Sequence, residues 1–117
     1  MRPLYTLFQS HLDLAHQYWD RIVSPGDIII DATCGNGLDT LKLAQLAITY
    51  EQGFVYACDI QANAVESARH YLEQHLPPQK LSRIQFVLGC HSEFPLEIQP
   101  ESVKLIVYNF VFSLGIN

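Results

Sequence analysis

Short, continuously apolar runs alternate along this chain with segments whose apolar residues recur at helical spacing. A run such as "IIIDA" lacks polar alternation, which is typical of a strand buried on both faces of a parallel sheet. Strands that alternate with helices indicate right-handed crossovers and an α/β fold, with a mostly parallel sheet covered by helices on both faces. The predicted helices are 4–23, 38–48 and 62–76, and the predicted strands are 28–32, 54–59, 84–89 and 103–110.

Composition and charge limit the classes of protein to which the chain can belong. Its 117 residues suffice for one domain, and 49% apolar with 16% charged residues is an ordinary globular composition. The net charge of −5 and only seven scattered lysine and arginine residues argue against a large nucleic-acid-binding surface. No apolar run is long enough to span a membrane, and no signal peptide is recognisable. Three cysteines without metal-binding spacing predict neither disulfides nor a metal site, so we expect a cytoplasmic protein with reduced thiols.

The loop "TCGNG", between the first predicted strand and the next helix, carries the main functional signal. Gly35 and Gly37 allow the backbone to turn tightly and to approach a ligand closely. The helix that follows begins with unpaired N–H groups. Sheets of this kind bind ligands at the carboxyl ends of their strands, where this loop lies. A simple strand-to-helix turn has the same two glycines, so the pattern alone is a weak signal.

Two carboxylates beside this loop favour S-adenosylmethionine over a dinucleotide. A nicotinamide-binding loop has a third glycine or alanine where this chain has Thr40. Asp31 ends the first predicted strand, where a negative charge is poorly placed beside a pyrophosphate but well placed to attract the cationic end of S-adenosylmethionine. Asp59 ends the second strand, where an acid accepts hydrogen bonds from the ribose hydroxyls of either cofactor.

Four segments together resemble a family of small methyltransferases described as rRNA methylases: "SPGDIIIDATCGNGLDT", "ACDIQ", "GCHSEF" and "VYNF". The first motif of that family has the form D-A-T-x-G-N-G-x-D-T, and every fixed position is present here. Members of the family methylate the 5-aminomethyl group of the wobble uridine in transfer RNA. The resemblance covers residues 16–110 and implies the N-terminal half of a Rossmann-like class I methyltransferase, with S-adenosylmethionine as cofactor and RNA as substrate.

The resemblance also implies roles for individual cofactor-binding residues. Asn36 and Asp39 are expected to contact the methionine part of the cofactor, and Gln61 to lie near the ribose held by Asp59. His91 is expected to border the cofactor from the third strand, and a surface loop histidine is the competing interpretation. The complete predicted cofactor site comprises Asp31, Gly35, Asn36, Gly37, Asp39, Thr40, Asp59, Gln61 and His91.

Asn109 is the predicted catalytic residue, because the resemblance places it opposite the transferred methyl group. An amide there would accept a hydrogen bond from the target amine and align its lone pair, so that positioning supplies most of the catalysis. An asparagine that only caps a turn is the competing interpretation. Cys34 could act as a nucleophile, but nothing nearby indicates a lowered pKa, so a small side chain filling a tight loop is preferred. His16 could cap or pack a helix, and Tyr18 with Trp19 could stack on a base or pack in the core.

The C-terminal sequence departs from the family. The family continues after the asparagine with Gly-Tyr-Leu-Pro-Gly-Gly, whereas this chain has "FVFSLGIN" after Asn109. We therefore expect residues 1–117 to form a single cofactor-binding domain, incomplete at its C-terminus, with apolar surface that a second copy or a partner subunit covers. Two other functions stay open: a non-catalytic module that binds the cofactor or a partner protein, and a NAD-dependent oxidoreductase.

Overall fold

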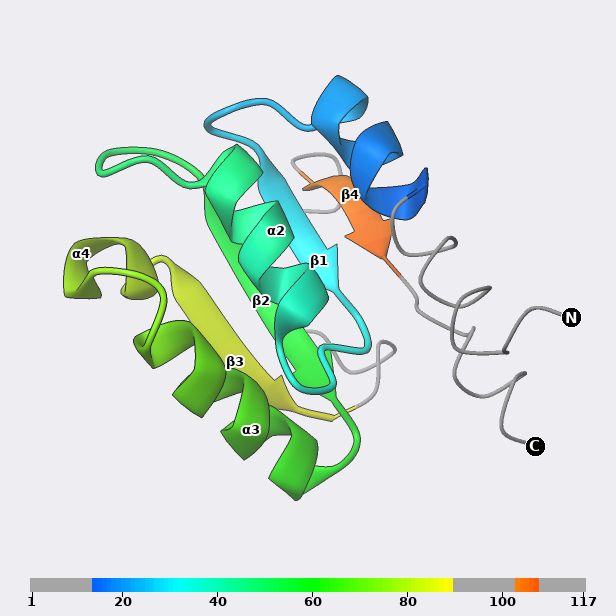
Figure 1. Cartoon of the computed structure of the whole chain (residues 1–117), viewed down its shortest axis with the longest axis vertical. Coiled ribbons are helices and arrows are strands. Elements are labelled where there is room, and N and C mark those ends of the chain that lie inside the picture. The colour runs from blue at the N-terminus through cyan, green and yellow to red at the C-terminus, as the bar shows by residue number, and fades with distance from the viewer. Residues whose placement is uncertain (1–13, 90–102, 108–117) are drawn as a thin grey trace, which may run out of the picture.

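The computed structural model describes residues 14–89 and 103–107 of the chain. Residues 14–22 are helical, and we call them the N-terminal helix. The elements that follow are β1 (Ile28–Asp31), α2 (Leu38–Ala47), β2 (Phe54–Asp59), α3 (Ala62–Glu73), α4 (Pro78–Leu81), β3 (Ile84–Leu88) and β4 (Val103–Val107) (Figure 1). None of the helices in these two ranges has the length and hydrophobicity needed to cross a membrane.

The strands of the described residues form one parallel sheet in the order β3-β2-β1-β4. This confirms the α/β fold that the alternation of strands and helices predicts. β1 lies inside the sheet, with β2 and β3 on one side of it and β4 on the other. The register pairs Asp31, the last residue of β1, with Ala57 of β2 and Val107 of β4. The strand order therefore reverses beside β1, and parallel sheets bind ligands beyond the carboxyl ends of the strands at such a reversal.

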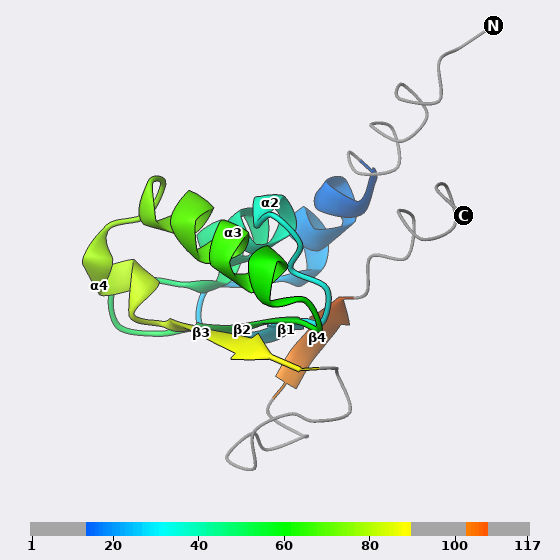
Figure 2. The ribbon, with the colours of Figure 1, turned by 90° about the horizontal axis from the view of Figure 1, so that it is seen from below.

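The described helices all lie on one face of the sheet (Figure 2). On that face, Ile29 of β1 and Val55 of β2 are completely buried against Leu43 of α2 and Leu72 of α3. Each fully buried aliphatic side chain of this size contributes about 1.5–3 kcal/mol through removal of apolar surface from water. The alternation of elements predicts helices on both faces of the sheet. Within the described residues, helices cover one face.

A pair of prolines both ends one helix and starts the next. Residues 62–76 carry helical periodicity, but α3 ends at Glu73, before the predicted end at Leu76. Pro77 has an extended backbone conformation, and Pro78 is the first residue of the short helix α4. Proline is tolerated in the first turn of a helix because its missing N–H would have no helical partner there. The two prolines therefore separate α3 from α4, and the chain passes from α3 into β3 through α4.

Candidate functional site

Residues 32–37 form the loop that leads from the carboxyl end of β1 into α2, and backbone hydrogen bonds fix it to both neighbouring strands. The N–H of Ala32 donates to the carbonyl oxygen of Val107, the last residue of β4, at 2.8 Å. The N–H of Cys34 donates to the carbonyl oxygen of Cys58 in β2, also at 2.8 Å. The loop thus crosses the carboxyl edge of the sheet from β4 to β2, at the place where the strand order reverses.

The two glycines of this loop serve different purposes. Gly37 has φ +96°, and a Cβ added to it would lie 3.1 Å from the Cα of Ala68 in α3, so this glycine allows the loop to pack closely on a helix. Gly35 has φ +53°, and a Cβ added to it would meet no atom of residues 14–89 or 103–107 within 4 Å. The backbone at Gly35 is therefore open to a ligand, whereas the backbone at Gly37 is in contact with the protein.

Asp59 connects this loop to the end of β2. One of its carboxylate oxygens accepts a hydrogen bond from the N–H of Gly35 at 3.1 Å, and the other accepts from the N–H of Gln61 at 3.0 Å. The side chain is half-buried. A carboxylate has about four acceptor positions, and these two backbone bonds leave room for further donors. The structure thus brings Gly35, Asp59 and Gln61 together.

Asp31 is completely buried at the end of β1. One carboxylate oxygen accepts a hydrogen bond from the Thr40 hydroxyl at 2.7 Å, and the other accepts from the N–H of Thr33 at 3.2 Å. The pKa of Asp31 is raised to about 7: burial raises it most, the negative charges of Asp39 and Asp59 also raise it, and the two hydrogen bonds lower it. Thr40 is also completely buried, so its hydroxyl supports Asp31 from inside the protein.

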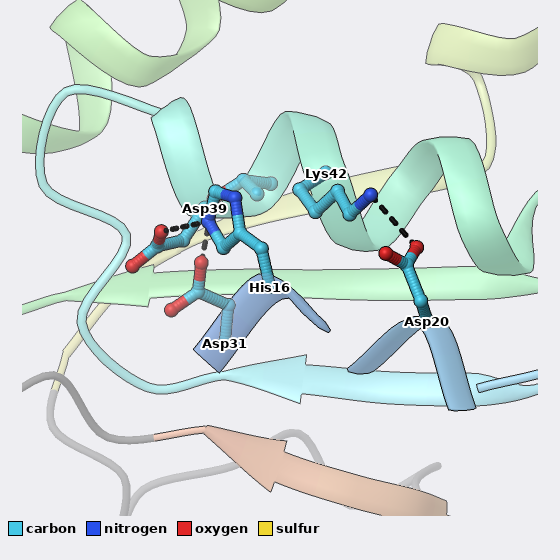
Figure 3. Close-up of polar contacts among 6 residues, drawn as sticks. His16, Asp20, Asp31, Asp39 and Lys42 are labelled. Atoms are coloured by element: carbon cyan, nitrogen blue, oxygen red, sulfur yellow. Dashed lines mark hydrogen bonds and ion pairs between the residues drawn. The ribbon is translucent and has the colours of Figure 1, made fainter. Parts of the chain in front are cut away.

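Asp39, in the first turn of α2, is held by the N-terminal helix (Figure 3). Its carboxylate lies 2.9 Å from Nε2 of His16, whose ring packs on Trp19 with the ring centroids 5.1 Å apart. A second, more exposed ion pair joins Asp20 to Lys42 at 2.8 Å between the same two helices. The sequence alone does not reveal the partner of His16, since this contact depends on how the two helices pack.

The remaining predicted residues differ in how much the structure says of them. Asn36 is exposed at the tip of the loop, where it is available to a ligand. His91 and Asn109 lie outside the described residues. Trp19 is buried in the core, which decides between the two interpretations of that residue, whereas Tyr18 is 58% exposed.

The cysteines of the described residues are suited to packing rather than to nucleophilic attack. Cys34 and Cys58 are both buried and free. Burial raises the pKa of both thiols, that of Cys58 to about 12 and that of Cys34 further, and the charges of Asp31 and Asp59 add to the effect. Since the thiolate is the reactive form, neither cysteine is activated. The described part of the chain also contains no group of three or more side chains arranged to hold a metal ion.

A parallel sheet, an open glycine loop at its point of reversal and acids at the ends of β1 and β2 are the attributes of a class I methyltransferase domain. A family described as a methyltransferase domain matches residues 23–117. The chain therefore belongs to this family of S-adenosylmethionine-dependent methyltransferases.

The relatives of the chain include proteins of the type that the sequence motifs predict. Over 110 residues it is 36% identical to a protein of Arabidopsis thaliana named tRNA (mnm(5)s(2)U34)-methyltransferase, chloroplastic, a match that covers 90% of this chain and 40% of the relative. The crystal structure of a candidate rRNA methylase from Clostridium thermocellum is 32% identical, with a TM-score of 0.65, and the match covers 75% of this chain and 45% of the other. These matches confirm the resemblance to the rRNA methylase family.

A further solved structure carries a ligand. It is a candidate methyltransferase from Streptococcus mutans in complex with SAH, 32% identical, with a TM-score of 0.61, and the match covers 75% of this chain and 45% of that one. The chain thus spans less than half the length of these relatives.

Proposed function

We propose that this chain binds S-adenosylmethionine at the carboxyl ends of β1 and β2, and that the complete site methylates the 5-aminomethyl group of the wobble uridine in transfer RNA. The observation that carries the proposal is the link between Asp59 and the N–H of Gly35, at 3.1 Å, beside backbone that is open on its Cβ side. This link sets an acceptor for ribose hydroxyls next to a surface that a ligand can approach closely.

The residues present fit the chemistry of this cofactor. Asp59 has acceptor capacity left for the two ribose hydroxyls. Ile60, directly after it, is 71% exposed and offers apolar surface for an adenine ring. Asp31 and Asp39 supply negative charge on the side of the site where the cationic methionine part would lie. We therefore assign Gly35, Asn36, Asp39, Asp59 and Gln61 to direct contact with the cofactor, and Asp31, Gly37 and Thr40 to the support of that surface.

The proposed mechanism is an in-line transfer, for which the bound cofactor supplies a methyl group on a sulfonium cation. The chain's residues bind and orient the donor, and no covalent enzyme intermediate is needed. The raised pKa values of Cys34 and Cys58 support this, because neither thiol is available as a nucleophile. Asn109 is proposed, from the family resemblance, to accept a hydrogen bond from the target amine, and His91 to border the cofactor.

The proposed substrate rests on relatives and on charge. The Arabidopsis relative is named as a transfer-RNA methyltransferase, and the Clostridium relative as an rRNA methylase. The net charge of −5 indicates that these residues make few contacts with the phosphate backbone of the RNA. We propose that the cofactor lies in this chain and that most RNA contacts lie elsewhere in the complete methyltransferase. The free, buried thiols support the cytoplasm as the proposed compartment.

Calorimetric titration of the 117-residue chain with S-adenosylmethionine and with S-adenosylhomocysteine tests the binding site. Asp59→Ala should weaken both affinities by about 1.5–3 kcal/mol, because charge-assisted hydrogen bonds to the ribose are lost. Glu73→Ala is a matched control, since it removes an exposed carboxylate at the end of α3 opposite to Gln61. Unchanged affinity in a folded Asp59→Ala variant would remove Asp59 from the site.

A second assay separates this function from its alternatives. Transfer of labelled methyl groups to transfer RNA that lacks the terminal wobble methylation should be measured with the chain and with a full-length relative. Cofactor binding without transfer in both proteins would support a non-catalytic module. Competition by NAD for the same site would instead support an oxidoreductase.

A further inference from the structure

Three carboxylates gather at the carboxyl edge of β1 and β2, and they differ in how well their charge is stabilised. Asp59 is half-buried and accepts two backbone N–H bonds. Asp39 has His16 as a partner. Asp31 is completely buried, accepts one hydroxyl and one N–H, and has no lysine or arginine within ion-pairing distance in the described part of the chain. Among the three, Asp31 has the most costly negative charge.

The protonation state of Asp31 is therefore balanced near neutral pH. Burial, with the charges of Asp39 and Asp59, raises its pKa to about 7. A neutral carboxyl group fits this buried position when no cation is near. A cation brought into the site would favour the ionised form, because a charge in a poorly solvated environment acts strongly on a buried neighbour.

The methyl donor and its product differ by one such charge. S-adenosylmethionine carries a sulfonium cation, whereas S-adenosylhomocysteine has a neutral thioether in its place, and the rest of the two molecules is the same. Contacts to the ribose or the adenine, such as those proposed for Asp59 and Ile60, are therefore available to both. Discrimination between donor and product requires a group that responds to the sulfonium charge.

We propose that Asp31 is this group: it holds a proton in the cofactor-free site and releases it when the cationic donor binds, so that the site favours the donor over the product. This inference rests on the proposed cofactor site. Asp31 acts as a specificity-determining residue from inside the protein, without touching the reacting atoms. The proton passes to the solvent on donor binding and returns when the neutral product remains.

Few other groups around Asp31 can produce the same pH dependence. Among the residues that the structure describes, the titratable groups that face it are Asp59 and Cys58 of β2, Asp39 of α2, Cys34 of the loop and, through Asp39, His16 of the N-terminal helix. Both thiols have strongly raised pKa values and stay neutral at pH 7. His16 is the group that the experiment has to separate from Asp31.

The test is calorimetric titration of the 117-residue chain with donor and with product at pH 5.5 and pH 7.0. Both pH values lie below the ordinary pKa of an α-amino group, about 7.7–8.0, so the amino group of either ligand stays protonated throughout. Donor affinity should rise about tenfold across this range, while product affinity changes less than about threefold. Titration at pH 7.0 in buffers of different ionisation enthalpy should show the release of about half a proton per donor bound and almost none per product bound.

Variants assign the effect to Asp31. Asp31→Asn should flatten the pH dependence of donor affinity and bring the affinities for donor and product closer together. Thr40→Val keeps Asp31 but removes the hydrogen bond that favours its ionised form, so the midpoint of the donor pH profile should move upward. This second variant keeps the test decisive if Asp31→Asn does not fold. Asp27→Asn, at the opposite end of the same strand, is the matched control and should keep the wild-type profile.

Four results would overturn the inference. Equal pH dependence for donor and product would show that Asp31 does not sense the sulfonium charge. Loss of the pH dependence in His16→Gln, with Thr40→Val unchanged, would place the titration at His16. Failure of both ligands to bind would overturn the proposed function and this inference with it, whereas binding of the product with no discrimination overturns the inference alone.

Discussion

The burial of Asp31 makes its ionisation oppose folding, and this predicts a specific pH dependence of stability. The folded-state pKa of about 7 lies above the ordinary value of 3.8, so the folded state keeps a proton that the unfolded chain releases. The resulting contribution to stability is fully present below about pH 4 and is lost as the pH rises through 7.

Asp31→Asn removes this titration. The free energy of unfolding of the variant, relative to wild type, should therefore increase from pH 5 to pH 7, by on the order of 1–2 kcal/mol. Urea unfolding at the two pH values measures this difference. An equal change in Asp27→Asn, or a constant difference between Asp31→Asn and wild type, would contradict the assignment.

Cys34 and Asn109 distinguish amine methylation from covalent attack on a pyrimidine ring. Cys34 is buried with a raised pKa, so Cys34→Ala should keep methyl transfer within about threefold. Asn109→Ala should lower it by about tenfold or more, because the target amine loses its alignment. Labelled-methyl transfer by this chain, and by a full-length relative with the corresponding changes, gives the comparison. Activity lost in the cysteine variant and kept in the asparagine variant would indicate covalent chemistry.

At the scale of elements, the loop between β1 and α2 separates packing from binding at its two glycines. Gly37→Ala forces a side chain into the left-handed region at φ +96° and against the backbone of Ala68, so it should lower the free energy of unfolding by about 1–3 kcal/mol. The methyl group of Gly35→Ala meets no atom within 4 Å in the described part of the chain, so its cost in stability should be about 1 kcal/mol. Its added methyl group should nevertheless weaken cofactor binding.

Thermal unfolding and cofactor titration of both variants test this division. Gly37→Ala should be the less stable protein. Gly35→Ala should show the larger loss of cofactor affinity relative to its loss of stability. Equal losses of affinity and stability in the two variants would mean that the open side of Gly35 does not face the ligand.

At the scale of the whole molecule, one face of the sheet has helical cover and the other has none within the described residues (Figure 2). On the face opposite to Ile29 and Val55, Ile106 of β4 lies beside Ile30 of β1, which is buried, and Ile30 pairs with the half-buried Tyr56 of β2. Ile106 is 42% exposed. Exposed apolar surface on a sheet favours association.

We predict that the 117-residue chain self-associates through this face. Ile106→Lys should increase the fraction of monomer measured by light scattering at matched concentrations, because a charge is costly to bury between two sheets. Tyr50→Lys changes another exposed apolar residue, 60% exposed against 42% for Ile106, in the loop before β2, and serves as the control. A wild-type chain that stays monomeric, or an equal effect of both variants, would argue against the open face as the contact surface.

The sequence by itself determined the class of fold and the positions of the glycine loop and of the two strand-end acids, because these depend on local pattern. The run "IIIDA" predicts β1, and the glycines of "TCGNG" predict the turn into α2. The bounds of the predicted strands place Asp31 and Asp59 at the strand ends. The parallel sheet then brings Asp31 and Asp59 to one edge whatever the details of packing.

Only the tertiary structure decided what each of these groups does. His16 and Asp39 are 23 residues apart in the sequence, and their contact follows from how the N-terminal helix packs on α2. Gly37 and Gly35 look equivalent in the sequence, yet Ala68 of α3 lies 3.1 Å from the Cβ position of Gly37, whereas no atom of the described residues lies within 4 Å of the Cβ position of Gly35. The raised pKa of Asp31 likewise results mainly from desolvation. Desolvation depends on all the elements packed around the carboxyl group, so the residues next to Asp31 in the sequence do not reveal it.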